Sequence, residues 1–312
     1  MNRLAGKALI TGSSGFIGLH LATELKKFGW EIHGVSRTKN SSSEDILSSC
    51  HTIDIREYQL LYSVLEKVSP DVVFHLAGEF TGDFESMYET NVIGTQNLLE
   101  AILRKKKDVR ILINGSAAEY GATLSEGKPI LENEAIHPKS LYGLTKAAQG
   151  TLARFYAKKH DLKVICVRTF NLVGPGEQER LVCSSIAHQV VRVENGRANK
   201  IVVQSLLSAR DFMDVRDAVR AYIQLIQKGE LGKIYNVCSG KLVKIQTVLE
   251  TLLGMAKVQP ILAQDPNCEN DMSQICGDAG ALFKATGWNP AIPIEQSLND
   301  LLEWVRKEYS TT

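Results

Sequence analysis

Two side chains that can transfer a proton, Tyr142 and Lys146, lie four residues apart in the segment SLYGLTK. On a helix this spacing places both side chains on one face. A phenol with an ordinary pKa near ~10 is a poor acid–base catalyst at neutral pH, but a neighbouring ammonium favours the phenolate and lowers that pKa. Ser116, in GSAAEYG about one helix earlier, adds a hydroxyl at the end of an apolar run. We therefore predict that Ser116, Tyr142 and Lys146 form a catalytic set.

The segment TGSSGFIG places three glycines between a strand-like run and a helical pattern. The first glycine would permit a tight turn, the second would let the backbone approach a pyrophosphate, and the third would let the helix pack close to the sheet. The helix N-terminus would offer amides and a positive dipole to the phosphates. The alternative is a turn with only a structural purpose. We predict a dinucleotide site with contacts from Gly12, Ser14, Gly15, Phe16, Ile17 and Gly18.

The residues after the second strand-like run indicate which dinucleotide binds. An acidic residue there would hold a ribose 2′-hydroxyl, whereas this chain has Ser36 and Arg37, with Lys39 nearby. Because a cation accommodates a 2′-phosphate, we predict NADP(H) as the cofactor, against the alternative of a solvated surface arginine. We further expect Asp54 and Ile55 to contact the adenine. We expect Leu76, Ala77 and Gly78 to contact the nicotinamide ribose.

These residues would be positioned by short β-rich runs that alternate with helical patterns through the first half of the chain. This alternation predicts a parallel sheet covered on both faces. Right-handed crossovers then make it a doubly wound α/β fold, and ligands are expected beyond the carboxyl ends of its strands. The predicted strands are 7–11, 31–36, 70–78, 110–115 and 163–171, and the predicted helices are 15–29, 56–69, 91–106 and 140–160.

After Asn171 this alternation ends. We expect the second half to form a lid beyond the strand ends, with part of it returning to the sheet. The elements predicted there are loops at 172–179 and 205–215, helices at 181–195 and 216–228, strands at 200–204 and 233–239, and a C-terminal mixture of helices and short strands.

The composition argues against several classes of protein. The net charge is +1, and the basic run at 104–110 is better explained as a helix end than as a nucleic-acid patch. None of the six cysteines forms a CxxC pair, so we expect reduced thiols and no metal site. No apolar run approaches the ~20 residues that span a bilayer, and the N-terminus does not resemble a signal peptide. We therefore expect a cytoplasmic protein with neither a membrane nor a nucleic-acid partner.

Motifs in chain order make the sequence recognisable. They are TGSSGFIG, HLAG, TNVIGTQNLLEA, GSAAEYG, YGLTK, RTFNLVGPG and RDFMDVRD. Together they resemble the extended short-chain dehydrogenase/reductase family from residue 7 to about 240, with a weaker match in ATGWNPAIPIEQSL. Within that family, RTFNLVGPG, ARDFMDVRD and YNVCSG are most similar to the GDP-4-keto-6-deoxymannose reductases, whose near relatives are the GDP-mannose 4,6-dehydratases.

The resemblance implies an organisation in two domains and a homodimer. The NADP-binding Rossmann domain would comprise residues 1–172 plus about 212–238. A smaller nucleotide-sugar domain would comprise about 173–211 plus 239–312. Two long helices of each subunit, here 92–105 and 143–159, would form the dimer.

The resemblance also implies a role for each matching residue. Ser116 would contact the reacting sugar oxygen, Tyr142 would act as the acid–base residue, and Lys146 would hold the nicotinamide ribose. Asn171 would bind the substrate, and Arg210 would hold its nucleotide part. The implied substrate is therefore a nucleotide sugar.

Two alanines after Ser116 favour reduction over dehydration. By resemblance, the dehydratases carry a proton-transferring pair at these positions, because one group must abstract the C5 proton and an acid must assist loss of the C6 hydroxyl. Here the positions hold Ala117 and Ala118, and Glu119 would point the other way if the segment is extended. We predict NADPH-dependent reduction of the C4 ketone of a nucleotide-linked 4-keto-6-deoxy sugar. The alternatives are a 4,6-dehydratase or 4-epimerase of the same family, and a non-catalytic Rossmann binding or sensor protein.

One departure from the reductases concerns the nucleotide. Where those proteins have an arginine and a glutamate before the last segment, this chain has Cys268 near the first position and Asp271 near the second. A missing cation would weaken contacts with a diphosphate or ribose. The nucleotide then differs from GDP, or another cation such as Arg180 or Lys241 takes the role.

Overall fold

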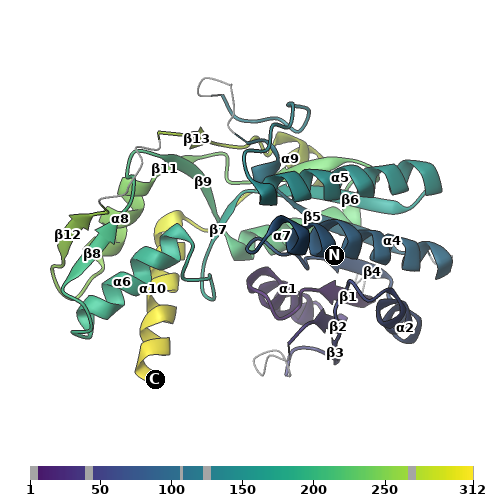
Figure 1. The fold of residues 1–312 in the computed structure, drawn as a ribbon, viewed down its shortest axis with the longest axis horizontal. Coiled ribbons are helices and arrows are strands. Elements are labelled where there is room, and N and C mark those ends of the chain that lie inside the picture. Colours follow the sequence, from purple (N-terminus) through teal and green to yellow (C-terminus); the bar gives the residue numbers. More distant parts are fainter. Residues whose placement is uncertain (1–5, 39–44, 106–107, 122–127, 266–271, 312) are drawn as a thin grey trace.

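The computed structural model describes residues 6–38, 45–105, 108–121, 128–265 and 272–311. Figure 1 shows two regions side by side: a large sheet covered by helices, and a smaller region of short strands and helices that contains the C-terminal helix. Over the described ranges, no helix combines the length and the apolar character that crossing a bilayer would demand.

The main sheet holds seven strands among the described residues, in the order β10-β6-β5-β4-β1-β2-β3, and every neighbouring pair is parallel. The order changes direction beside β1, as in a doubly wound sheet. The predicted α/β fold class is therefore confirmed. The strands are β1 (Lys7–Thr11), β2 (Glu31–Ser36), β3 (Ser49–Thr52), β4 (Val72–His75), β5 (Arg110–Ser116), β6 (Lys163–Thr169) and β10 (Ile234–Val237).

Helices cover both faces of this sheet and bury alternate residues of each strand. Ile10 belongs to the core on one face, formed with α1, α7 and α9, whereas Leu9 belongs to the core on the other face, formed with α2, α4 and α5. Successive side chains of a strand point to opposite faces, so a continuous apolar run fills both cores. The helices are α1 (Phe16–Lys27), α2 (Tyr58–Val68), α4 (Gly94–Lys105), α5 (Leu141–His160), α7 (Val215–Lys228) and α9 (Gly280–Thr286).

The smaller region has its own apolar core, which in the described part of the chain is enclosed by three helices and two small sheets. β9 pairs with β7, β11 and β13, and β8 pairs with β12. The strands are β7 (Asn171–Val173), β8 (Lys200–Val203), β9 (Ala209–Asp214), β11 (Leu242–Lys244), β12 (Ile261–Gln264) and β13 (Gln274–Ile275). The helices are α6 (Val182–Glu194), α8 (Ile245–Gly254) and α10 (Ile294–Thr311).

The prediction of a loop over 205–215 is wrong, because β9 lies within it. Its charged residues are typical of a loop, but here tertiary hydrogen bonds offset the free-energy cost of burying them. Asp211 is fully buried and accepts hydrogen bonds from the backbone amides of Ser239 and Gly240 at 2.7 and 2.9 Å. Buried polar groups are tolerated when such partners are present, and here the partners come from distant parts of the chain.

The helix predicted at 91–106 also differs in its start. A short helix α3 (Phe84–Tyr88) and a π-helical turn η2 (Glu89–Ile93) precede α4. Within that turn the Asn91 side chain accepts from the Glu79 amide at 2.8 Å and donates to Thr145 Oγ1 at 3.0 Å. These contacts tie the turn to the loop after β4 and to α5, so tertiary packing decides the local geometry.

The division into two domains stays a prediction, and described contacts cross it. Leu282 and Trp288 lie in the segment assigned to the smaller domain, yet both pack in the core of the main sheet. The Trp288 indole donates to the carbonyl oxygen of Asp217, on α7, at 3.1 Å. Helix α9 is thus anchored to the larger sheet.

This anchoring predicts a large loss of stability for Leu282→Ala. Leu282 is completely buried, so truncation should lower the free energy of unfolding by about 2–5 kcal/mol. The neighbouring Phe283 is 50% exposed and provides the control, because Phe283→Ala should cost clearly less. Urea unfolding of the two variants measures both values, and equal losses would contradict the packing of α9 against the main core.

Candidate active site

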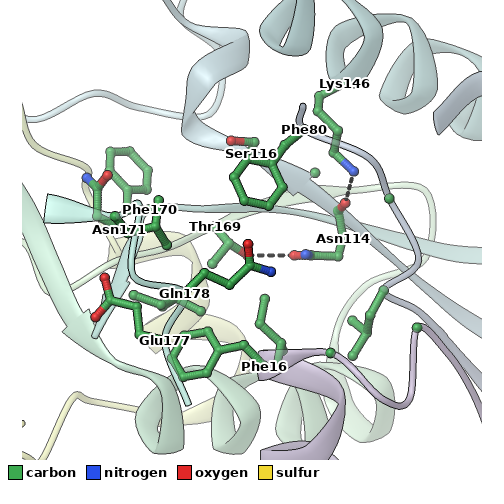
Figure 2. A pocket seen from close by; sticks show the side chains of 18 of the residues that line it. Phe16, Phe80, Asn114, Ser116, Lys146, Thr169, Phe170, Asn171, Glu177 and Gln178 are labelled. Carbon is green, nitrogen blue, oxygen red and sulfur yellow. Dashed lines mark hydrogen bonds between the residues drawn. The ribbon is translucent and has the colours of Figure 1, made fainter. Parts of the chain in front are cut away.

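A cavity of about 360 Å³ lies where the carboxyl ends of the central strands meet the smaller region. Figure 2 shows side chains from both regions around it, including Asn114 and Ser116 from β5 and Glu177 and Gln178 from the segment after β7. The predicted catalytic residues Ser116, Tyr142 and Lys146 all line this cavity. The fold therefore brings together side chains that the sequence separates by 30 residues.

The glycine loop forms another wall of the cavity and fits a phosphate-bearing ligand. Gly12 has φ +74°, and a Cβ there would lie 2.8 Å from the Ala77 amide nitrogen. A Cβ on Gly18 would collide with the carbonyl oxygen of Gly12, so α1 can approach the loop only because residue 18 is glycine. Gly15 is the N-cap of α1 and has no side chain to satisfy the first amides, which leaves them for an anion.

A second cavity of about 420 Å³ continues from the first over the ends of β1 and β2. Three of the predicted cofactor residues, Phe16, Ile17 and Gly18, line the first cavity. The second cavity is lined by these others: Ser14, Ser36, Arg37, Asp54, Ile55, Leu76, Ala77 and Gly78. Lys39 lies outside the described residues. Two joined cavities that share the glycine loop suit an elongated ligand such as a dinucleotide.

Arg37 forms an ion pair in this second cavity. Its Nη2 lies 3.1 Å from Oε2 of Glu79, and its side chain is 56% exposed. The guanidinium also helps to lower the pKa of the Glu79 carboxyl, against the opposing effect of burial. A bound 2′-phosphate would compete with Glu79 for this cation, and sequence reasoning missed that competitor.

Lys146 is buried and oriented by the strand opposite it. Its Nζ donates to the carbonyl oxygen of Asn114, the residue two before Ser116, at 2.5 Å. Burial lowers the pKa of the ammonium to about 8, with the negative charge of Glu119 acting in the opposite direction. Figure 2 shows this side chain pointing to Asn114 across the cavity wall.

The expected lowering of the Tyr142 pKa is wrong for the ligand-free protein. Burial raises it to about 12, a hydrogen bond with Ser116 partly offsets that rise, and the charge of Glu119 adds to it. Because the ammonium of Lys146 is directed to Asn114, desolvation dominates. Tyr142 is therefore a neutral phenol at neutral pH, which is the form that donates a proton.

Ser116 is held by a tight turn rather than by an extended segment. It is the N-cap of the 3₁₀ turn η3 (Ala117–Glu119), and its hydroxyl accepts from the Ala118 amide at 3.1 Å. A Cβ on Gly143 would collide with the Ala118 carbonyl oxygen, so the turn lies directly against the start of α5. This close approach places Ser116 beside Tyr142.

Glu119 is fixed away from the cavity by a buried network. Its carboxylate accepts from the Ser116 amide at 2.9 Å and pairs with Arg168 Nε at 2.8 Å. The two side chains are only 4% and 6% exposed. Arg168 also lies over the ring of Tyr120, 4.5 Å from its centroid. The sequence indicated only that Glu119 points elsewhere, whereas the structure identifies what it binds.

The two predicted substrate residues besides Ser116, which are Asn171 and Arg210, are placed differently. Asn171 lines the first cavity. Arg210 lines none of the described cavities, and its guanidinium donates to the carbonyl oxygens of Ala209 and Ser273 at 3.0 and 2.7 Å. Cys268 and Asp271 lie outside the described residues. The role of Arg210 stays a prediction.

Sequence reasoning missed several residues that line the first cavity. Asn114 could have been found as the polar residue that closes the apolar run of β5, but nothing local marked the others. They come from several loops and from the ends of strands and helices, and the whole fold brings them together: Phe80, Thr169, Phe170, Leu172, Glu177, Gln178, Leu181, Val182 and Phe212.

Comparisons with known proteins agree with this geometry. The model of the NAD dependent epimerase/dehydratase family matches residues 8–238. GDP-6-deoxy-D-mannose reductase of Pseudomonas aeruginosa is 33% identical, with 97% of this chain and 99% of that protein covered. UDP-glucose 4-epimerase of Streptomyces lividans is 28% identical, with 96% of each chain covered.

A solved structure extends the similarity to three dimensions. RMD from Pseudomonas aeruginosa complexed with NADPH matches with a TM-score of 0.85 and 31% identity. The match covers 97% of this chain and 99% of that one. The likeness therefore includes both the main sheet and the smaller region.

The network around Glu119 predicts a large effect of Arg168→Met. Removing one partner of a buried ion pair leaves an uncompensated charge, so unfolding should become easier by about 3–5 kcal/mol. Lys163, on the same strand, pairs with Asp108 at an exposed site, and Lys163→Met should cost about 0–1 kcal/mol. Chemical denaturation compares the two, and similar losses would show that the buried pair does not hold the turn.

Proposed function

The chain belongs to the NAD dependent epimerase/dehydratase family, within the extended short-chain dehydrogenases/reductases, and from that premise we propose that it reduces the C4 ketone of a nucleotide-linked 4-keto-6-deoxy sugar with NADPH. The observation that carries the proposal is the placement of Ser116, Tyr142 and Lys146 in the cavity that the glycine loop also lines. The similarity to a GDP-6-deoxy-D-mannose reductase over nearly the whole chain supports this substrate class.

The protonation state of Tyr142 suits reduction. Bound NADPH would supply the hydride that forms the new C–H bond at C4. Tyr142, a neutral phenol with a pKa of about 12, donates its proton to the oxygen of that carbon, so that the ketone becomes an alcohol. Ser116 hydrogen-bonds the same oxygen as negative charge develops on it. With the cofactor bound, Lys146 would hold its ribose and would stabilise the phenolate that remains.

The environment of Glu119 argues against dehydration. Loss of water from C6 needs a base for the C5 proton and an acid for the departing hydroxyl. Ala117 and Ala118 offer neither, and the carboxylate of Glu119 is occupied by the Ser116 amide and Arg168. Epimerisation would use the same three catalytic residues as reduction. The structure therefore argues less strongly against epimerisation than against dehydration.

Arg37 supports NADPH over NADH. It lies at the end of β2 and lines the second cavity, where the adenosine half of a dinucleotide would lie. The guanidinium is exposed, and among the residues that the structure describes its ion pair is with Glu79, so that a 2′-phosphate can reach it. The described relative whose structure contains NADPH is consistent with this preference.

Tyr142→Phe tests the proposed reaction. The purified protein should oxidise NADPH only when a 4-keto-6-deoxy nucleotide sugar is supplied, and the variant should lose this activity by at least about 10²-fold, because its proton donor is gone. Absorbance at the nicotinamide band measures the rate for GDP-, UDP-, dTDP- and CDP-linked ketosugars. Absence of turnover with all four would contradict the proposal, and product formed from an unreduced nucleotide hexose without net NADPH use would favour the alternatives.

The pH dependence tests the role of Lys146. Its ammonium has a pKa of about 8 and is therefore present below that pH and lost above it. Tyr142 stays protonated throughout this range. The kcat/KM of reduction should be level below about pH 8 and fall as the pH rises through it.

Lys146→Arg provides the control for this profile. Its guanidinium keeps its charge, so any residual activity should lack the alkaline decline. A wild-type profile that stays level to pH 10 would contradict a protonated Lys146 as a participant.

We further propose that the chain forms a homodimer through α4 and α5, which pack against each other. The outer side of α5 exposes large apolar residues, among them Leu144 at 47% and Phe155 at 52%. Such residues on one helix are typical of a surface that a partner covers.

Phe155→Glu should convert this dimer to a monomer, because it places a charge in an apolar interface. Light scattering after size-exclusion chromatography measures the mass of the variant. Phe28, at the end of α1, is 47% exposed and gives a matched control, since Phe28→Glu should leave the dimer intact. A monomeric wild-type protein would overturn the proposal.

A further inference from the structure

The two cavities meet at a junction that the structure defines by shared residues. Phe80, Gln178 and parts of the glycine loop line both cavities. The N-terminus of α1 lies on the same side as the loop and directs its first amides outward. A dinucleotide that places its nicotinamide in one cavity and its adenosine in the other would have its pyrophosphate at this junction. This step rests on the proposed function.

Arg180 contacts two residues of this junction, Phe80 and Gln178. It belongs to the segment after β7, which connects to α6, and it lines the second cavity. The guanidinium lies over the ring of Phe80, 3.6 Å from its centroid, and Nη2 donates to Gln178 Oε1 at 2.6 Å. Both contacts are with residues that line both cavities. Figure 2 shows Phe80 and Gln178 among the side chains that surround the first cavity.

The contacts of the Arg180 guanidinium differ from those of the other cationic side chains in these cavities. Arg37 is paired with Glu79, and Lys146 donates to the carbonyl oxygen of Asn114. Among the described residues, Arg180 contacts an aromatic ring and an amide but no carboxylate. A guanidinium that stacks on a ring keeps the N–H groups of its edge directed outward.

We propose that Arg180 binds the pyrophosphate of the cofactor, so that the phosphates lie between this guanidinium and the amides at the start of α1. The planar guanidinium suits bidentate contact with phosphate oxygens. Phe80 and Gln178 hold it in place before the cofactor arrives, which reduces the entropy lost on binding. The sequence left Arg180 as a candidate for the nucleotide of the substrate, whereas its position in the second cavity assigns it to the cofactor.

The proposal is tested by dissociation constants measured by titration calorimetry on the full chain. Arg180→Gln should weaken NADPH and NADH by the same factor, about tenfold, because both carry the pyrophosphate. ADP-ribose, which has the pyrophosphate but no nicotinamide, should lose the same factor. Arg180→Lys should retain part of the affinity, since an ammonium still attracts phosphate.

Two matched variants separate this effect from others. Arg37→Gln should weaken NADPH much more than NADH, because only NADPH carries the 2′-phosphate. Arg197 also stacks on an aromatic ring, that of Tyr309 at 5.2 Å, but it lines neither cavity. Arg197→Gln should leave every dissociation constant unchanged, which controls for the loss of one surface charge.

The outcomes separate this proposal from the proposed function. Unchanged dissociation constants in Arg180→Gln, with tight binding by the wild type, would overturn the role of Arg180 alone. A loss confined to NADPH would also overturn it, because the residue would then bind the 2′-phosphate. A wild-type chain that binds neither dinucleotide would overturn the proposed function and this inference together.

Discussion

The hydrogen bond from Lys146 to the carbonyl oxygen of Asn114 is the contact on which the site depends. It joins α5 to the end of β5, and Tyr142 precedes Lys146 by one helical turn while Ser116 follows Asn114 by two residues. One contact of 2.5 Å therefore fixes the separation of the two hydroxyl-bearing side chains. It also gives the buried ammonium a carbonyl dipole to bind, as a buried charge requires.

The strand end is itself held rigidly. The Asn114 side chain accepts from Thr169 at 2.7 Å and from the Tyr222 hydroxyl at 3.0 Å, so neighbouring elements fix it on both sides. Below it, the ion pair of Glu119 with Arg168 secures the turn that carries Ser116. A Cβ on Gly115 would collide with the Glu119 carboxylate, so glycine is required where that side chain folds back. Position at this site comes from packing and buried polar contacts together.

The proposed cofactor site, which comprises the two joined cavities, is built differently, because both regions of the chain contribute to it. The glycine loop belongs to the main sheet, whereas Gln178 and Arg180 come from the segment that leads into α6. Contacts such as that of His20 with the Pro175 carbonyl oxygen, at 2.8 Å, hold this segment over α1. Cofactor affinity and the relative position of the two regions are therefore physically coupled.

The sequence by itself determined the fold class, the glycine loop and the catalytic candidates, because strand and helix periods, glycine positions and a four-residue spacing are local properties. It failed over 205–215, where the charges of β9 are satisfied by distant amides such as that of Gly277. It also gave the wrong direction for the Tyr142 pKa, since proximity in sequence does not reveal where the Lys146 ammonium points. Only the tertiary structure decided that Glu119 is bound to Arg168, that Arg37 faces Glu79 and that Arg180 lies on Phe80. These are contacts between residues about 40 to 100 positions apart, and burial and charge act through space rather than along the chain.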